Sequence, residues 1–166
     1  MPESINRSLV GMSPIQLRGY YVREFNFRIN SDFDPGKPSE SSFNDLQFKF
    51  QLGSLDKKDI QEDSEIYEFW ESMFSVKYES GGTARINSPY YFSISITGLF
   101  CLNKKSYEKR GMQMGNKAFI EHNSQSILYG IVRQIVSSFM DKGPFPSAIL
   151  PTLFFSPVNI APPDKA

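Results

Sequence analysis

Residues 127–144 read ILYGIVRQIVSSFMDKGP, and this stretch decides the expected fold. Pairs of apolar residues recur every four positions, which is the spacing of one continuous face of an α-helix. Gly143 and Pro144 form a standard helix stop, because a glycine ends the last turn and a proline cannot continue it. The sequence therefore predicts one long helix over residues 118–142. Its apolar pairs are Ile127/Leu128, Ile131/Val132, Ile135/Val136 and Phe139/Met140.

The apolar face of this helix is wider than one sheet can cover. The paired positions sweep roughly 220° of the circumference, whereas a helix packed on a single sheet needs a stripe of about 100° or a little more. The surplus must therefore meet a second surface. Helices packed between the sheets of two or more subunits would provide it, and a homodimer or a dimer of dimers is the simplest closed assembly. The alternative is that the proline-rich C-terminal segment folds back over the surplus.

Four segments before the helix alternate apolar and polar residues with the period of a β-strand. They lie near residues 15–29, 46–52, 66–79 and 90–100, and polar or breaker-rich connections are expected at residues 31–42, 55–65 and 103–117. In the first strand, Tyr20 and Val22 fall on the polar face. The opposite, buried face is expected to carry Ile15, Leu17, Tyr21, Phe25, Phe27 and Ile29. The predicted fold class is α+β: a four-stranded antiparallel sheet with one long helix packed at the oligomer interface.

Composition narrows the classes of function. The length of 166 residues favours one domain, expected over residues 15–157, between a flexible N-terminus (1–14) and a short disordered tail (158–166). Acidic and basic residues balance at 18 each, which argues against a dedicated nucleic-acid binder. One Cys and one His leave no expected disulfide, metal site or cofactor. Without a signal peptide or a membrane-length apolar run, a cytoplasmic protein with no membrane insertion is expected.

The order of these elements and several local strings resemble the SecB family of chaperones. Residues 17–27, LRGYYVREFNF, resemble the family's first strand, where a Tyr precedes a basic–acidic pair by two residues, here Tyr21 and Arg23-Glu24. Residues 91–102, with Gly98 before Phe100, resemble its fourth strand. Residues 127–151 resemble its long helix and the exit from it. Shared features there are Ile127-Leu128, Arg133, Gly143, Phe145-Pro146 and Leu150-Pro151, and the resemblance covers about residues 13–157.

The resemblance implies a non-enzymatic, ATP-independent holdase that assembles as a homotetramer, built as a dimer of dimers. The expected oligomer interface is the set of eight helix residues paired above, Ile127 to Met140. Candidate client-binding residues are aromatic and apolar side chains near the loop after the first strand and the region after the helix. They are Phe33, Phe43, Trp70, Phe145, Leu153, Phe154 and Phe155, and ordinary core packing is the alternative for each.

Two departures from the family pattern bear on the expected client. The prolines after residue 145 argue against the second helix that family members usually have there, and the neutral charge and short tail differ from export-type members that dock on SecA. The main hypothesis is therefore a SecB-like chaperone of a toxin–antitoxin–chaperone module, with an antitoxin as client and a role in anti-phage defence. The alternative is a general chaperone that delivers preproteins to SecA. A further hypothesis, a single-strand nucleic-acid binder that stacks bases on Phe48 and Phe50, is opposed by the zero net charge.

Overall fold

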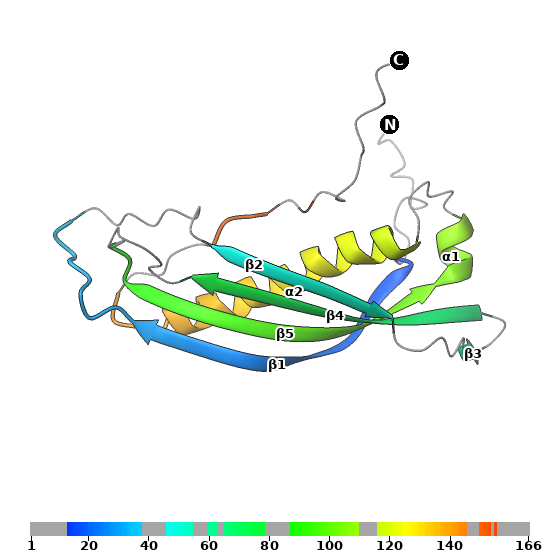
Figure 1. Ribbon diagram of the computed structural model, residues 1–166, viewed down its shortest axis with the longest axis horizontal. Helices are drawn as coiled ribbons and strands as arrows, with labels where there is room; N and C mark the ends of the chain where they lie inside the picture. Colours follow the sequence, from blue (N-terminus) through cyan, green and yellow to red (C-terminus); the bar gives the residue numbers. More distant parts are fainter. Residues whose placement is uncertain are drawn as a thin grey trace, which may run out of the picture.

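The computed structural model describes residues 13–37, 46–54, 60–62, 65–78, 87–109, 116–145, 150–153 and 155. The chain forms β1 (Ile15–Ile29), β2 (Gln47–Ser54), β3 (Ile60–Glu62), β4 (Glu65–Tyr78), β5 (Tyr90–Asn103), α1 (Lys104–Lys109) and α2 (Asn116–Met140), in that order. All strand pairs are antiparallel, the spatial order is β1-β5-β4-β2, and the short β3 pairs with β4. The predicted α+β fold, an antiparallel sheet with one long helix, is confirmed (Figure 1).

Two short elements lie where the sequence predicted only connections. β3 falls in the expected connection 55–65, and α1 falls in the expected loop 103–117, so both predictions were wrong over these residues. α1 begins because the Asn103 side-chain oxygen accepts a hydrogen bond from the Ser106 N–H at 2.9 Å, which caps the first turn. It is held in place because the Tyr107 ring packs on Phe119 of α2, with 5.0 Å between ring centroids. Neither contact has a periodic sequence signal.

Two β-bulges in β1 change which of its residues face the helix. The register with β5 shifts between Leu17 and Gly19 and again between Val22 and Glu24, which leaves Arg18 and Arg23 as the extra residues. Each extra residue resets the alternation of faces. Tyr20 therefore pairs with Gly98, and Val22 pairs with Ile96.

Those two partners lie on the helix side of β5. A Cβ atom added to Gly98 would lie 2.8 Å from Cδ2 of Leu128 in α2, so this position faces the helix directly. Directly opposed residues of an antiparallel pair share a face. Tyr20 and Val22 thus face the helix side, Tyr21 faces away from it, and the predicted faces of these three residues were wrong.

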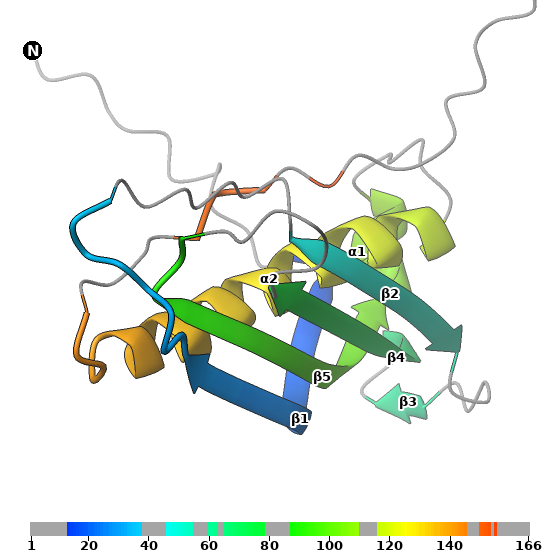
Figure 2. The ribbon, with the colours of Figure 1, turned by 60° about the vertical axis from the view of Figure 1, so that its left-hand side comes forward.

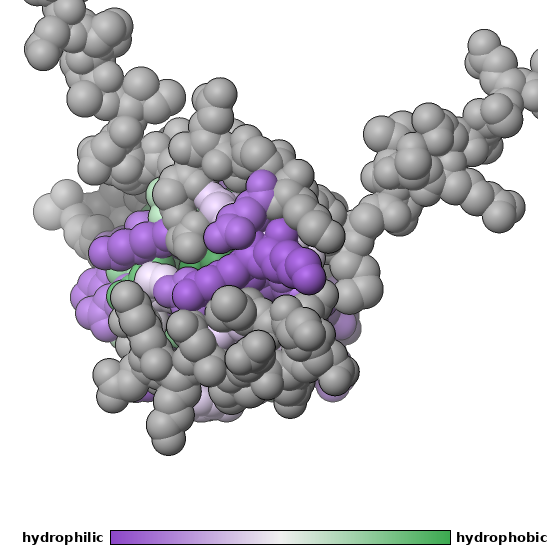
Figure 3. All heavy atoms as spheres, turned by 90° about the vertical axis from the view of Figure 1, so that its right-hand side faces the viewer, coloured by the Kyte–Doolittle hydropathy of each residue, from purple (hydrophilic) through white to green (hydrophobic). Residues whose placement is uncertain are grey.

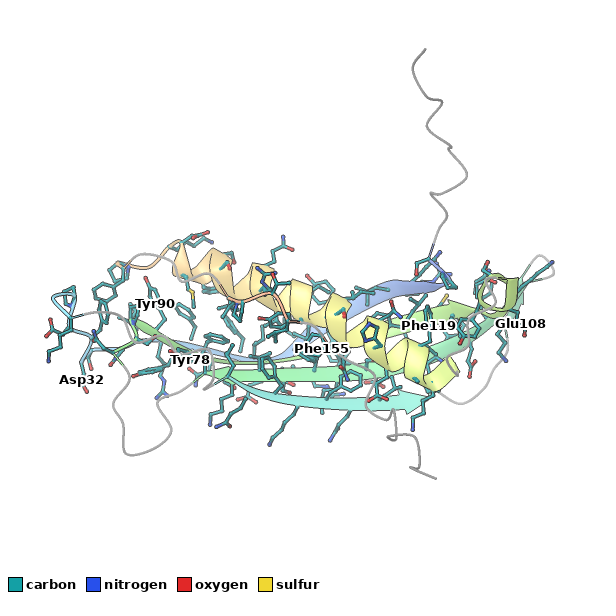
Figure 4. All side chains as sticks on the ribbon, turned by 90° about the horizontal axis from the view of Figure 1, so that it is seen from above. Asp32, Tyr78, Tyr90, Glu108, Phe119 and Phe155 are labelled. Atoms are coloured by element: carbon teal, nitrogen blue, oxygen red, sulfur yellow. The ribbon has the colours of Figure 1, made fainter. Side chains whose placement is uncertain are left out.

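α2 crosses one face of the sheet diagonally (Figures 1 and 2). The Tyr129 ring meets Phe48 of β2 and Phe74 of β4, with centroids 6.0 and 6.1 Å apart. Nearer its C-terminus, Phe139 meets Phe25 of β1 at 4.6 Å. The core fills the space between the helix and the sheet. The aromatic residues labelled in Figure 4 lie on the helix side of the sheet: Tyr78, Tyr90, Phe119 and Phe155. Its fully buried members include Phe74, Tyr90, Phe92, Ile94, Ile96, Phe100, Leu128, Val132 and Val136.

Candidate interaction surfaces

The structure divides the eight predicted interface residues of α2 into two stripes. Leu128, Val132, Val136 and Met140 are at most 2% exposed and face the chain's own sheet. Ile127, Ile131 and Ile135 are half-buried, and Phe139 is 44% exposed. Because residues four apart align along a helix, these last four form a second stripe beside the first. Only this second stripe is available to another subunit.

The second stripe borders β1, and together they form an apolar surface. Tyr20 and Val22 of β1 are 49% and 42% exposed on the same side of the sheet as α2. The Phe25–Phe139 ring contact joins the two elements. We call this surface the open patch, because the described part of the chain leaves it exposed. It consists of Tyr20, Val22, Phe25, Ile131, Ile135 and Phe139.

The opposite flank of α2 is covered by residues 150–153 and 155, here called the C-terminal segment. The Tyr129 hydroxyl donates a hydrogen bond to the Pro151 carbonyl at 2.7 Å. The Phe155 ring lies edge-on to Phe74 and to Tyr129, with 5.8 Å between centroids in both pairs. We call the rings beneath it the aromatic cluster: Phe48, Phe50, Phe74 and Tyr129. The C-terminal segment thus folds back, as the alternative foresaw, but on the flank away from the open patch.

The predicted client-binding residues separate into two places. Phe33, in the loop after β1, packs on Phe145 after α2, with ring centroids 4.8 Å apart. Leu153 and Phe155 pack instead beside the aromatic cluster. Trp70 is only 8% exposed and belongs to the core. The remaining two candidates, Phe43 and Phe154, lie outside the described residues.

The exit from α2 is fixed by Tyr90 at the start of β5. Its hydroxyl donates to the Phe145 carbonyl at 2.6 Å and accepts from the Phe145 N–H at 2.9 Å. Gly143 makes this approach possible, because a Cβ atom there would overlap the Tyr90 hydroxyl oxygen. These contacts fix the position of the chain at Phe145, directly after the helix end.

Tyr129 is the polar group that links the covered flank of α2 to the C-terminal segment. Burial raises the pKa of its hydroxyl, and the nearby positive charge of Arg133 opposes that shift. The hydroxyl therefore stays protonated around neutral pH and can donate to a carbonyl. Neither Tyr129 nor Phe74 was predicted as a site residue, and Phe48 was considered only as part of a base-stacking platform. Tyr129 lies one position after Leu128, outside the four-residue repeat that guided the sequence analysis.

The outer face of the sheet, away from α2, carries many polar residues together with the exposed Tyr21 and Leu99. The guanidinium of Arg23, at the second bulge, lies 2.7 Å from the Thr97 hydroxyl and 3.2 Å from the Glu71 carboxylate. Ser75 and Ser95 share a hydrogen bond of 2.9 Å on the same face. Phe48 and Phe50, proposed as a base-stacking platform, do not lie here, because they pair with Val76 and Phe74 on the helix side. The end of the molecule at α1 is also mainly hydrophilic in its described residues (Figure 3).

Among the described residues, no cluster of three or more His, Cys, Asp or Glu side chains is arranged to hold a metal ion. In the same part of the chain, no helix has the length and apolar character needed to cross a lipid bilayer.

Comparisons with known proteins give likenesses among solved structures. No protein-family model matches the chain, and no curated protein sequence matches it. Among solved structures, the chain is similar to a SecB-like chaperone of Mycobacterium tuberculosis, solved in complex with a ChAD peptide from the HigA1 antitoxin. The alignment covers 84% of this chain and 90% of the other, with 13% sequence identity and a TM-score of 0.47.

Proposed function

We propose that this protein is an ATP-independent holdase that assembles with copies of itself and binds unfolded segments of other proteins. The observation that carries the proposal is the open patch, where Tyr20, Val22 and Phe139 are 49%, 42% and 44% exposed on adjoining elements. Single exposed apolar side chains are common on soluble proteins. A contiguous group of them beside a half-buried stripe instead marks a surface for another chain.

Self-assembly is the simplest use of the open patch. A two-fold axis beside α2 would place the second stripe of one helix against the same stripe of a second copy, and such an interface is closed and self-complementary. We propose a homotetramer, a dimer of dimers, with the helices between the sheets. The sequence likeness of residues 127–151 to the SecB helix and its exit supports this arrangement.

For the client we propose an unstable antitoxin of a toxin–antitoxin–chaperone module. Two features support this client over exported preproteins. The chain carries no net charge, unlike acidic export-type members of the family it resembles. The described residues 150–153 after α2 belong to no helix, unlike the second helix that family members usually have there. A general chaperone that delivers preproteins to SecA is the alternative.

An aggregation assay tests the proposal. A candidate antitoxin, taken from the genes that neighbour this protein's own, is diluted from urea with and without the purified protein, and light scattering is followed. We expect suppression of aggregation near equimolar ratio, no effect of added ATP, and no binding of SecA. If the protein suppresses the aggregation of neither the antitoxin nor a denatured model protein, the holdase function is rejected. Tight SecA binding, together with rescue of an export-deficient strain, would favour the alternative client.

A further inference from the structure

We propose that the C-terminal segment occupies, within its own chain, a binding site for an extended segment of a client protein, and that Tyr129 anchors the client's main chain there. The inference rests on the holdase function proposed above and deepens it. The occupied site consists of the aromatic cluster and the Tyr129 hydroxyl. The segment that fills it indicates which client sequences fit.

The contacts of the C-terminal segment are ones that a foreign chain could reproduce. Its described residues 150–153 and 155 belong to no helix or strand. Its main-chain anchor is the Pro151 carbonyl, which accepts the hydrogen bond from Tyr129 at 2.7 Å. A carbonyl is common to every residue type, so this contact fixes the position of a segment without selecting its sequence. Selection is left to the side chains that meet the rings.

The spacing of the buried side chains defines the client pattern. Leu150 is 3% exposed, Leu153 packs against the core, and Phe155 lies edge-on to two rings of the aromatic cluster. These residues are the first, fourth and sixth of the segment. The site therefore fits a segment with large apolar side chains at those positions, an aromatic one at the sixth, and free choice at the third, where Thr152 is exposed.

Several observations favour exchange over permanent attachment. Among described residues, Tyr129 makes the one short hydrogen bond to the segment, and the Arg133–Thr152 contact is long at 3.5 Å. Leu153 and Phe155 are only half-buried. Phe48, at the edge of the aromatic cluster, is 38% exposed, so an incoming side chain can reach the rings before the resident segment leaves.

A competition experiment with a defined probe tests the inference. The probe is a fluorescent peptide of residues 147–157, SAILPTLFFSP, added to the full-length protein. Weakening the resident segment with the double change Leu153→Ser and Phe155→Ser should tighten probe binding at least tenfold. A matched peptide carrying the same two serines should not bind. Equal probe affinity for the wild type and the double variant, both folded by circular dichroism, would overturn the inference and make the segment a fixed part of the core.

Two further variants keep the test decisive. Should the double variant fail to fold, Phe155→Ala alone should still tighten probe binding about threefold, and no change would overturn the inference. Adding Tyr129→Phe to either variant should weaken probe binding several-fold, because the main-chain anchor is lost; unchanged binding would remove Tyr129 from the proposal.

Failure of this inference can be told apart from failure of the proposed function. The same samples are assayed for suppression of aggregation of a denatured model protein. Suppression by the wild type without any gain in probe binding by the variants would leave the holdase standing and reject this site. Gain of probe binding in a protein that suppresses no aggregation would establish the site and reject the holdase.

Discussion

The two flanks of α2 are both apolar, but only one of them is covered within the described part of the chain. On the β2 side, the C-terminal segment packs on Phe74 and Tyr129, and a hydroxyl is aimed at a main-chain carbonyl. On the β1 side, Val22 and Phe139 stay more than two-fifths exposed. A broad apolar surface suits lasting burial against a second copy of the chain. A site that combines rings with a main-chain anchor suits an extended segment that can be exchanged.

The largest expected effect comes from a charge placed in the open patch. Ile131→Asp should weaken self-association by about 100-fold or more, because an unpaired carboxylate in a dry interface costs several kcal/mol. Light scattering at fixed concentration measures this as a loss of mass. Gln134→Asp is the matched control, since residue 134 is exposed on the same helix and should leave the mass unchanged. An Ile131→Asp variant with the wild-type mass would remove the open patch from the assembly.

The second effect tests how the helix exit supports the covered flank. Gly143→Ala should destabilise the fold by about 1–3 kcal/mol, because the new Cβ atom must displace the Tyr90 ring. Gly130→Ala is the control: nothing lies within 4 Å of its Cβ position, and alanine favours a helix interior by about 1 kcal/mol. Urea unfolding measures both changes. Equal midpoints for the two variants would show that the Tyr90–Gly143 contact does not constrain the exit.

Periodicity predicted most of the fold but misjudged part of β1. The four-residue repeat of α2 and the alternation in β5 gave their positions, because each depends on the chain's own pattern. Alternation alone could not predict which face of the sheet carries Tyr20 and Val22. The bulges that decide it arise from how β1 pairs with β5, and the sequence of β1 alone does not show that pairing. That error hid Tyr20 and Val22, two of the six residues of the open patch.

The candidate sites were predicted less completely than the fold. The prolines predicted a non-helical, extended chain after the helix, and the described residues 150–153 and 155 belong to no helix or strand. The client-binding candidates were predicted as one group, but Phe33 and Phe145 lie in one place, and Leu153 and Phe155 lie in another. Their separation into two places depends on where α2 crosses the sheet, which no local pattern encodes. For the same reason Tyr129 was missed, since its partners come from β2, β4 and the C-terminal segment.

A smaller effect tests whether the covered flank of α2 contributes to stability alone, while the open patch contributes to assembly. Tyr129→Phe should cost about 0.5–1.5 kcal/mol, the usual worth of one hydrogen bond, and should leave the assembled mass unchanged. Tyr21→Phe is the control, because its hydroxyl bonds Arg23 on the exposed outer face and should contribute less. Urea unfolding and light scattering on the same samples make the comparison. A change of mass in Tyr129→Phe would mean that the two flanks are coupled.

The smallest effect is a dependence of stability on alkaline pH. Because burial raises the pKa of Tyr129 in the folded chain, the unfolded chain loses this proton first as the pH passes about 10. The stabilisation that the protonated Tyr129 hydroxyl gives the folded chain is therefore fully present below that pH. It is lost as the pH rises through the higher pKa that Tyr129 has in the folded chain. The difference in unfolding free energy between the wild type and Tyr129→Phe should accordingly shrink with rising pH. A constant difference would mean that the hydroxyl is solvated as in the unfolded chain, and that the C-terminal segment does not shield it.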